Sequence, residues 1–523
     1  MTLSVAVVAP LPPARTGPAP YLASLLPALS EQVDLTLCVP EVDAVRPELR
    51  ERWDVRDLDA RHDPRHGLVV YHLANNPWHA EVLDAAMDGP AGLLVLHDAS
   101  LHHLQVGRTL GAGDEDAYRS LLMSAHGSCG STVADLATAA PTGPFAFERF
   151  LYDCLAPVLD RHLGVQVHSR FAADLVRRRC PGLPVHVVPL RAPSPVAPAS
   201  RSAWGIPLGR IVLGHAGFVT GPKRYDVMCA AVASLVAEGL DVHLLLAGED
   251  GSQGDLDRVV GELGLVGRVT CTGWQSDDDF DRTIAAFDVA LSLRWPHAGE
   301  SSATLAALLA QGVAVVAEPV GSWAEFPADI VARADLSGGA VEGLLDAVRP
   351  FVADSALRQS WSRRAARYAV EHLSTEVCAG ALADVFASVA QERLTPVEQR
   401  RRALARRDAL GPVVPRLRGL PVACPGQRLL VVGAPPEVLA AVPAWGYELC
   451  EAPIRRMETG SVDVVCLWGP VDLAEVHRVL APLGLLHAPE LDLEPAPWGL
   501  SAVGPGQARK TGPILLRRPL LAG

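Results

Sequence analysis

The sequence predicts an α/β protein built from parallel sheets that are wrapped by helices. Short apolar runs alternate with longer helical patterns through almost the whole chain, and this alternation is typical of parallel sheets. The chain has 523 residues, which exceeds the roughly 250 residues of a usual single core. The pattern fills one half of the chain, repeats in the next and restarts near Arg428. We therefore expect two larger domains and a smaller C-terminal α/β domain.

The first predicted domain covers residues 1–195. An apolar run at residues 4–9 precedes a loop rich in Pro and Gly, and a helix begins near Pro20. Three prolines between residues 193 and 198 form a stiff linker to the next domain. Further predicted strands lie at residues 33–39, 68–72, 92–97, 166–169 and 185–188.

The second predicted domain covers residues 196–395 and repeats the plan. A helix is expected at residues 230–238, and a long helical stretch at residues 353–390 closes the domain, with a break at residues 373–375. The predicted strands lie at residues 211–215, 242–247, 269–272, 289–293 and 314–317.

A basic segment at residues 396–425 leads to the third predicted domain, residues 426–523. The segment carries five arginines, and such a run is typical of a solvated linker helix; a patch for anionic lipid is the alternative. The arginines are Arg400, Arg401, Arg402, Arg406 and Arg407. Strands of the third domain are expected at residues 428–432, 463–467 and 483–487.

Charge and cysteine content limit the classes of partner. The formal net charge is −13, which disfavours binding to nucleic acid but allows a local basic groove for one anion. The 10 cysteines form no C-x-x-C pair, so neither a zinc site nor a disulfide framework is expected, and the cytoplasm is the predicted compartment. We see no signal peptide and no apolar run of about 18 residues that would span a membrane; peripheral membrane contact stays open.

A glycine-rich loop follows the first strand of the second domain. Gly217 and Gly221 let a backbone approach a phosphate closely, and the helix after them offers free N–H groups and a positive dipole end. Lys223 and Arg224 stand at that end, where a helix dipole alone disfavours cations, so a bound anion explains them. A surface turn with solvated basic residues is the alternative.

A second polar loop runs from Arg294 through Gly299 to Glu300, Ser301 and Ser302. It offers a carboxylate and hydroxyls to a sugar, beside helix N–H groups for a diphosphate. Helix capping is the alternative reading of the serines. Capping is also the interpretation of the acidic run at residues 277–279, where no metal is expected.

With these loops, residues 1–390 resemble the family-4 retaining glycosyltransferases, which have the GT-B fold of two facing Rossmann-like domains. In the second domain the resemblance rests on the glycine-rich loop, "LLLAGEDG", "VTCTGWQSDDDF" and "GESSATLAALLAQGVAVVAEPVGSWAEFP". In the first it rests on "PLPPARTGPAPYLASLLPAL", "YHLANNPWH", "VLHDASLHHL" and "VHSRFAADLV".

The resemblance implies roles for matching residues. Lys223 with Arg224 would bind the donor diphosphate and neutralise the leaving nucleotide, and Glu300 would lie near the donor sugar. The turn at Gly17 would be where donor and acceptor meet, and His97 would lie against the transferring sugar. Ser301, Ser302, Gly217, Gly299 and Arg294 would complete the donor site, and Asn75, Asn76, Asp98, His102 and His103 would line the acceptor side, or else be surface or satisfied core.

Two departures bear on activity. The second glutamate of the family's motif, which holds the ribose, is replaced by Leu308, or by Ala307 in the other alignment. The arginine usual early in the phosphate loop is absent, since Gly217 and Phe218 stand there, and Arg294 or Arg224 would have to substitute. A non-catalytic relative that serves as a binding or scaffold partner of an active transferase is therefore the alternative function; an epimerase or phosphorylase on this fold has no matching residues.

The mechanism implied by the resemblance is metal-independent front-face transfer, with retention and an oxocarbenium-like transition state. The nucleotide-diphosphate sugar is a substrate, and no cofactor is expected. The acceptor (small molecule, glycan or peptide) and the oligomeric state, including a homo-oligomer, stay open.

The third domain resembles a fragment of an S-adenosylmethionine-dependent methyltransferase, through "RLLVVGAPPEVLAAV", "GSVDVVCLWGPVDL" and "EVHRVLAPLGLLHA". Only Gly433 remains of the cofactor loop, and Ala434, Pro435 and Pro436 follow it. Prolines remove N–H donors where the cofactor needs them, so we expect a degenerate module that does not bind S-adenosylmethionine.

Overall fold

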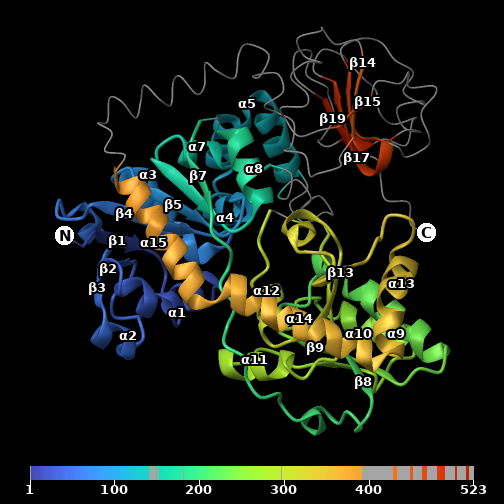
Figure 1. Cartoon of the computed structure of the whole chain (residues 1–523). Helices are drawn as coiled ribbons and strands as arrows, with labels where there is room; N and C mark the ends of the chain where they lie inside the picture. The colour runs from blue at the N-terminus through green and yellow to red at the C-terminus, as the bar shows by residue number, and fades with distance from the viewer. Residues whose placement is uncertain are drawn as a thin grey trace.

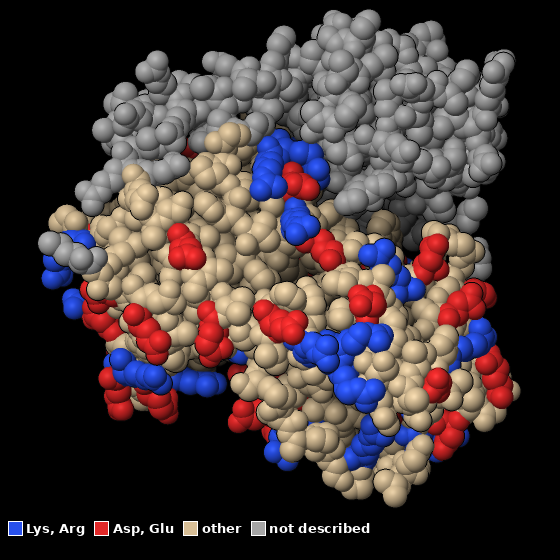
Figure 2. All heavy atoms as spheres, in the orientation of Figure 1, with Lys and Arg blue, Asp and Glu red and all other residues tan. Residues whose placement is uncertain are grey.

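The computed structural model describes residues 2–139, 149, 152–180, 182–295, 297 and 299–391, together with six strands between residues 428 and 517. Residues 2–391 form two α/β domains, each with a parallel sheet between helices, as Figure 1 shows. The predicted fold class of these two domains is confirmed. On the face in Figure 2, acidic and basic side chains are interspersed, so the net negative charge makes no single-sign field there.

The N-terminal domain has a seven-stranded sheet in the order β3-β2-β1-β4-β5-β6-β7, with every neighbouring pair parallel. The central strands are apolar on both faces because a hydrophobic core covers each face. The strands are β1 (Ser4–Val8), β2 (Asp34–Val39), β3 (Asp54–Asp57), β4 (Leu68–Leu73), β5 (Leu93–Leu96), β6 (Gly164–Val167) and β7 (Val185–Val187).

The second domain has a six-stranded parallel sheet in the order β10-β9-β8-β11-β12-β13, again between two cores. Its strands are β8 (Ile211–Ala216), β9 (Val242–Ala247), β10 (Val269–Cys271), β11 (Val289–Ser292), β12 (Ala314–Ala317) and β13 (Val331–Arg333).

Helices cover both faces of each sheet (Figure 1). Those of the first domain are α1 (Pro18–Ser30), α2 (Pro47–Arg52), α3 (Ala80–Asp88), α4 (His102–Arg108), α5 (Glu115–Ala139), α7 (Ala156–Leu159) and α8 (Arg170–Arg179). Those that follow β8 are α9 (Tyr225–Ala237), α10 (Asp255–Glu262), α11 (Asp277–Ile284), α12 (Ala303–Ala310), α13 (Ala340–Ala353), α14 (Ser355–Leu373) and α15 (Thr375–Gln391).

The last two helices tie the domains together. They break at Ser374, as predicted, where the backbone is extended. Ala365, Ala369 and Leu373 of α14 pack into the core of the second domain, whereas α15 packs against α1 in the core of the first. By packing, α15 therefore belongs to the first domain, which differs from the division at residue 195.

The stretch Ser355–Gln391 is also the one described helix long and apolar enough to cross a membrane, by length and composition. Many of its apolar side chains lie in the two domain cores, whereas Val370 and Val377 are exposed.

The third sheet has the order β15-β14-β16-β17-β19-β18, with β14 to β17 parallel and β19 antiparallel to its neighbours. All three strands predicted for this domain are present. The basic segment 396–425 and the loop of Gly433 to Pro436 lie outside the described residues. The strands are β14 (Arg428–Val432), β15 (Glu448–Cys450), β16 (Val462–Leu467), β17 (Leu480–Ala488), β18 (Ser501–Ala502) and β19 (Ile514–Arg517).

Candidate active site

Several of the predicted site residues follow the strands at which each sheet reverses its order. In the first sheet the chain runs outward from β1 to β3 and resumes on the other side at β4; in the second the same reversal separates β8 from β11. Ligands of open parallel sheets bind outside the carboxyl ends of such strands. Gly17 follows β1 and Asn75 follows β4, while Lys223 follows β8 and Glu300 follows β11.

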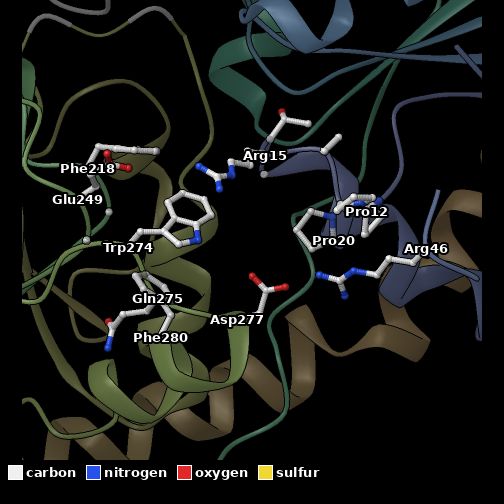
Figure 3. A pocket seen from close by; sticks show the side chains of 16 residues that line it. Pro12, Arg15, Pro20, Arg46, Phe218, Glu249, Trp274, Gln275, Asp277 and Phe280 are labelled. Atoms are coloured by element: carbon white, nitrogen blue, oxygen red, sulfur yellow. The ribbon is translucent and has the colours of Figure 1, made fainter. Parts of the chain in front are cut away.

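A cavity of about 290 Å³ lies between the two domains, beside the loops after β1 and β8. From the first domain it is lined by the loop after β1 and by Arg46; from the second it is lined by the loops after β8, β9 and β10. Figure 3 shows side chains from both domains around the cavity, with Arg15 pointing toward Trp274. The second domain contributes Gly217, Phe218, Gly248, Glu249, Trp274, Gln275, Asp277 and Phe280.

Gly217, Lys223 and the start of α12 converge on one point. The backbone of Gly217 has φ +108°, which favours glycine. A Cβ atom on Gly217 would lie 3.7 Å from Lys223 Nζ and 3.8 Å from Thr304 Cγ2. Gly248 packs against the same loop, since a Cβ there would lie 2.3 Å from the Gly217 carbonyl oxygen. These glycines therefore let backbone and ammonium come close together.

The start of α12 retains unused donors. Ser302 caps the helix by accepting the Leu305 N–H at 3.1 Å, so the predicted capping is confirmed for this serine. Among the described residues, the N–H groups of Ala303 and Thr304 have no acceptor. Ser301 lies half-buried just before the cap. An anion beside Lys223 would find these N–H groups and the positive end of the helix.

Lys223 is half-buried and has no salt bridge among the described residues. Burial lowers the pKa of its ammonium to about 7, Arg294 lowers it further and Glu300 opposes the shift. It is one of only two lysines in the chain, the other being Lys510. The ammonium of Lys223 thus lies at a place where no carboxylate among the described residues compensates its charge.

The two arginines predicted to help Lys223 are paired internally. Arg224 adopts φ +56° and its guanidinium donates to Glu318 at 2.7 Å. Glu318 also accepts the backbone N–H of Arg294 at 3.2 Å, and burial raises its pKa. The guanidinium of Arg294 forms an ion pair with Glu300. Both guanidinium charges are therefore balanced by a carboxylate.

Backbone contacts bring the two domains together beside Glu300. The N–H of Ala99 donates to the carbonyl of Gly299 at 3.3 Å. Gly299 has φ +75°, and a Cβ there would lie 2.7 Å from the Ala99 Cβ, so only glycine allows this approach. The adjacent residues Asp98 and Glu300 are thereby brought near each other across the domain boundary. Burial raises the pKa of Asp98 to about 6, with a smaller contribution from the charge of Glu300.

A second interdomain contact was not predicted. The carboxylate of Glu325 accepts the N–H groups of Arg170 (2.9 Å) and Phe171 (2.5 Å) at the start of α8. The Phe171 ring packs edge-on against His297, with centroids 5.2 Å apart. A carboxylate at a helix N-terminus is stabilising, and this one fixes the first domain on the second.

His97 is enclosed in a chain of histidines. The carbonyl of Val188 can only accept, so His168 Nδ1 donates to it at 2.9 Å and His168 Nε2 accepts from His97 Nδ1 at 3.1 Å. His97 Nε2 then accepts from His72 Nδ1 at 3.1 Å. Burial lowers the pKa of His168 to about 4 and of His72 to about 3, so the rings are neutral.

Both ring nitrogens of His97 are thus occupied by other histidines. A direct role of His97 against the sugar stays a prediction, and any such contact has to use the ring carbons or the backbone.

The remaining predicted residues divide into two groups. Asn75 bonds the Leu104 N–H (3.1 Å) and the His103 ring (3.1 Å), and its own N–H donates to Asp98 (2.7 Å). These contacts fix Asp98 and His103 at the cleft. Asn76 donates to Thr16 at 3.0 Å, which braces the loop after β1.

His102 has the setting of the alternative interpretation, a satisfied core residue. It is fully buried, and its ring bonds the Tyr152 carbonyl and the Tyr118 hydroxyl, both at 2.7 Å. It is therefore a satisfied core residue, and the acceptor-side role does not fit it.

Three further sequence expectations concern the ribose position, the acidic run at residues 277–279 and a metal site. Leu308 and Ala307 are buried in the core under α12, so neither supplies a polar group for a ribose. Asp277 to Asp279 form the first turn of α11, where Ser276 caps by accepting the Asp279 N–H at 3.2 Å, which confirms the capping interpretation. Among the described residues no cluster of three His, Cys, Asp or Glu could hold a metal.

Comparisons with known proteins agree with this architecture. Residues 210–354 match the family model described as glycosyl transferases group 1. A comparison with curated proteins gives no significant match. Among solved structures, sucrose-phosphate synthase from Thermosynechococcus elongatus is similar, with TM-score 0.54 and 16% identity, over 75% of this chain and 100% of that one.

HepE from Anabaena, solved with UDP and glucose, is similar with TM-score 0.51 and 14% identity, over 74% of this chain and 100% of that one. The same protein solved with UDP-glucose gives TM-score 0.50 and 13% identity over the same shares. The two-domain body therefore has the GT-B fold. Within it, the second domain carries the sequence pattern of group 1 glycosyltransferases.

Proposed function

We propose that this protein transfers a sugar from a nucleotide-diphosphate sugar to an acceptor, with retention at the anomeric carbon. The observation that carries the proposal is the cradle of Gly217, Lys223 and the first turn of α12. It combines a close backbone approach, an uncompensated ammonium and free N–H groups at one point. These are the groups that bind a diphosphate and stabilise it as it leaves.

The donor sugar fits next to the cradle, toward the first domain. Glu300 follows Gly299 at the interdomain contact, and its carboxylate is oriented by Arg294. Asp98 and His103 face it from the acceptor side. Closure of the cleft by the Ala99–Gly299 and Glu325–α8 contacts excludes water, which favours transfer over hydrolysis.

UDP is the nucleotide we propose first, because one of the proteins with the same fold was solved with UDP and with UDP-glucose. Each donor phosphate carries a negative charge, and the leaving diphosphate takes up more as the glycosidic bond breaks. Lys223 and the α12 N–H groups meet that charge, so the reaction needs no metal and no cofactor in this proposal. Cytoplasmic location and a degenerate third domain complete it.

A thermal-shift screen with UDP, GDP, dTDP and ADP and their sugars tests the donor site. A ligand that binds only the folded state at a hundred times its Kd stabilises by about 2.7 kcal/mol. We expect one nucleotide family to raise the Tm of the wild type and of Lys510→Ala, but not of Lys223→Ala. No shift by any nucleotide at millimolar concentration would overturn the proposal in favour of a non-catalytic scaffold.

Retention is tested by slow hydrolysis of the preferred α-linked donor without an acceptor. Proton NMR identifies the anomer first released, before mutarotation. Release of the α-anomer is expected, and release of the β-anomer would show inversion. Addition of EDTA should leave the hydrolysis rate unchanged.

A further inference from the structure

The diphosphate cradle contains fewer free positive charges than a sugar nucleotide has phosphates. Arg224 is paired with Glu318 and Arg294 with Glu300. Lys223 is thus left to balance two phosphates. A further cation has to come from another part of the cleft if the second phosphate is to be matched.

Helix α1 of the first domain points at the cleft, but the N–H groups at its start cannot supply the missing positive charge. Helix α1 starts with Pro18, and Pro20 is its third residue, so two positions of its first turn have no N–H. The N–H between them, that of Ala19, donates to the Thr16 carbonyl at 3.1 Å. The usual anion-binding donors of a helix start are therefore absent or used.

The same loop leaves room for a ligand. Gly17 has φ −54°, which any residue adopts, and a Cβ there would meet no atom within 4 Å. Neither backbone strain nor packing within the protein therefore requires a glycine at this position. Gly17 lines the interdomain cavity together with Gly217, so the open space faces the phosphate loop.

Two exposed cations of the first domain line this cavity, Arg15 and Arg46, and of these Arg15 stacks on an aromatic ring. It is exposed, and its guanidinium carbon lies 5.4 Å from the centre of the Trp274 ring, across the domain boundary. It has no salt bridge among the described residues. Trp274 in turn packs near Phe218, with ring centroids 5.9 Å apart. Figure 3 shows Arg15 reaching from the first domain over the Trp274 ring.

Stacking on an aromatic face orients a guanidinium without using its donors. A cation–π contact engages the flat face of the group, whereas its N–H bonds lie in the plane and stay available for bidentate binding of phosphate. Phe218 and Trp274 therefore hold Arg15 beside the phosphate loop with its donors free.

We propose that Arg15 is a donor-binding residue, which contacts the diphosphate from the first domain while Lys223 contacts it from the second. Arg15 thus supplies the charge that the phosphate loop lacks. Because the two cations come from different domains, the diphosphate links donor binding to closure of the cleft. This inference rests on the proposed function, since it assigns a residue to the same donor site.

The test compares UDP with UMP by isothermal titration calorimetry at low salt. The variants are Arg15→Gln, Arg15→Lys and the matched control Arg46→Gln, since Arg46 is also exposed and lines the same cavity. We expect Arg15→Gln to weaken UDP at least tenfold and UMP less than twofold. Arg15→Lys should regain part of the loss, and Arg46→Gln should change neither ligand more than twofold.

Equal losses for UDP and UMP in Arg15→Gln would overturn the proposal, because Arg15 would then act only through the Trp274 stack. An unchanged UDP affinity would overturn it as well. Failure of the proposed function looks different: wild type and Lys223→Ala would then bind UDP equally, or not at all. The Tm of each variant without ligand confirms that it folds.

Discussion

The carboxyl ends of the two sheets carry chemically opposite groups. In the first domain His72, His97 and His168 are neutral and bond one another, and the chain of bonds ends on a backbone carbonyl. In the second domain burial lowers the pKa of Lys223 to about 7, and the ammonium lacks a counter-ion among the described residues.

The contrast shows how one fold divides two tasks. The histidine rings bond one another in series, although His72 Nε2 has no hydrogen-bond partner among the described residues. A neutral hydrogen-bonded network of this kind offers a wall of fixed shape. Burying an uncompensated charge beside N–H groups without acceptors costs free energy. A bound anion removes that cost. The carboxyl ends of β4 to β6 therefore suit positioning of an uncharged sugar or acceptor, and the loop after β8 suits a diphosphate.

The largest effect on the donor reaction is expected from removing the charge of Lys223 in the second domain. Lys223→Met should lower kcat/KM for the donor about a hundredfold or more, in the range found for loss of one group that stabilises a developing negative charge. The Tm without ligand should change little or rise. Donor hydrolysis, with Lys510→Ala as control, measures this, and a loss under fivefold would contradict the role of Lys223.

A change of pH should give the next largest effect. Lys223 must be protonated to bind an anion, and its pKa is about 7 in the free protein. UDP affinity should therefore fall as the pH rises from 7 to 9, by up to about tenfold per unit. Titration calorimetry of the wild type and of Lys223→Met checks this, since the variant should lack the dependence.

The same pKa predicts the opposite trend for stability. The folded-state pKa is lowered, so between about pH 7 and 10 the unfolded chain binds more protons at this residue than the folded one. The contribution of Lys223 to the free energy of unfolding therefore rises with pH in that window. Urea titrations of the wild type against Lys223→Met, without nucleotide, would show this difference, and parallel curves would refute it.

Loss of the close contact between the domains should have an intermediate effect. Gly299→Ala places a side chain at a left-handed position, which costs about 1–2 kcal/mol, and brings it against Ala99. Turnover should fall about tenfold or more, as small misplacements at a reacting centre do. Adding Ala99→Gly should restore part of the activity through relief of the clash, and strictly additive effects would exclude that contact as the cause.

The smallest effect on donor binding is expected from a substitution in the histidine chain. His97→Ala leaves a buried donor of His72 without its acceptor, at a cost of about 1–3 kcal/mol, so the Tm should fall. UDP affinity should nevertheless stay within twofold, because the diphosphate cradle belongs to the other domain. A loss of UDP affinity as large as that of Lys223→Met would remove the distinction between the two sides.

The central strands and the edge strands β7 and β10 were predictable from the sequence, whereas the edge strands β3 and β13 were not. Buried strands such as β9 are continuous apolar runs. Strand β3 reads Asp-Val-Arg-Asp and lies mostly exposed at an edge, and β13 has three residues at the other sheet's edge. Such short edge strands have no apolar pattern that predicts them, because they form by hydrogen bonding to one neighbouring strand.

The site was predictable only as far as single loops go. The glycine-rich loop predicted Lys223 from local sequence. The pairing of Arg294 with Glu300 and of Arg224 with Glu318 was not predicted, and the latter joins residues 94 positions apart. The histidine chain needs β4, β5 and β6 side by side. Arg15 and Trp274 meet only when the domains face each other. The one sequence signal for this contact was a tryptophan directly after a glycine turn, which is exposed in the fold.

The most direct test of the nucleotide-diphosphate site uses the scarcity of lysine in this chain. Trace acetylation with acetic anhydride at pH 7.5, read by mass spectrometry, gives separate rates for Lys223 and Lys510. UDP or UDP-glucose is expected to slow acetylation of Lys223 at least tenfold and leave Lys510 unchanged, because a bound diphosphate covers the ammonium and raises its pKa. Equal rates for Lys223 with and without nucleotide, at about 10 mM of UDP, GDP, dTDP or ADP, would contradict a diphosphate site at Lys223.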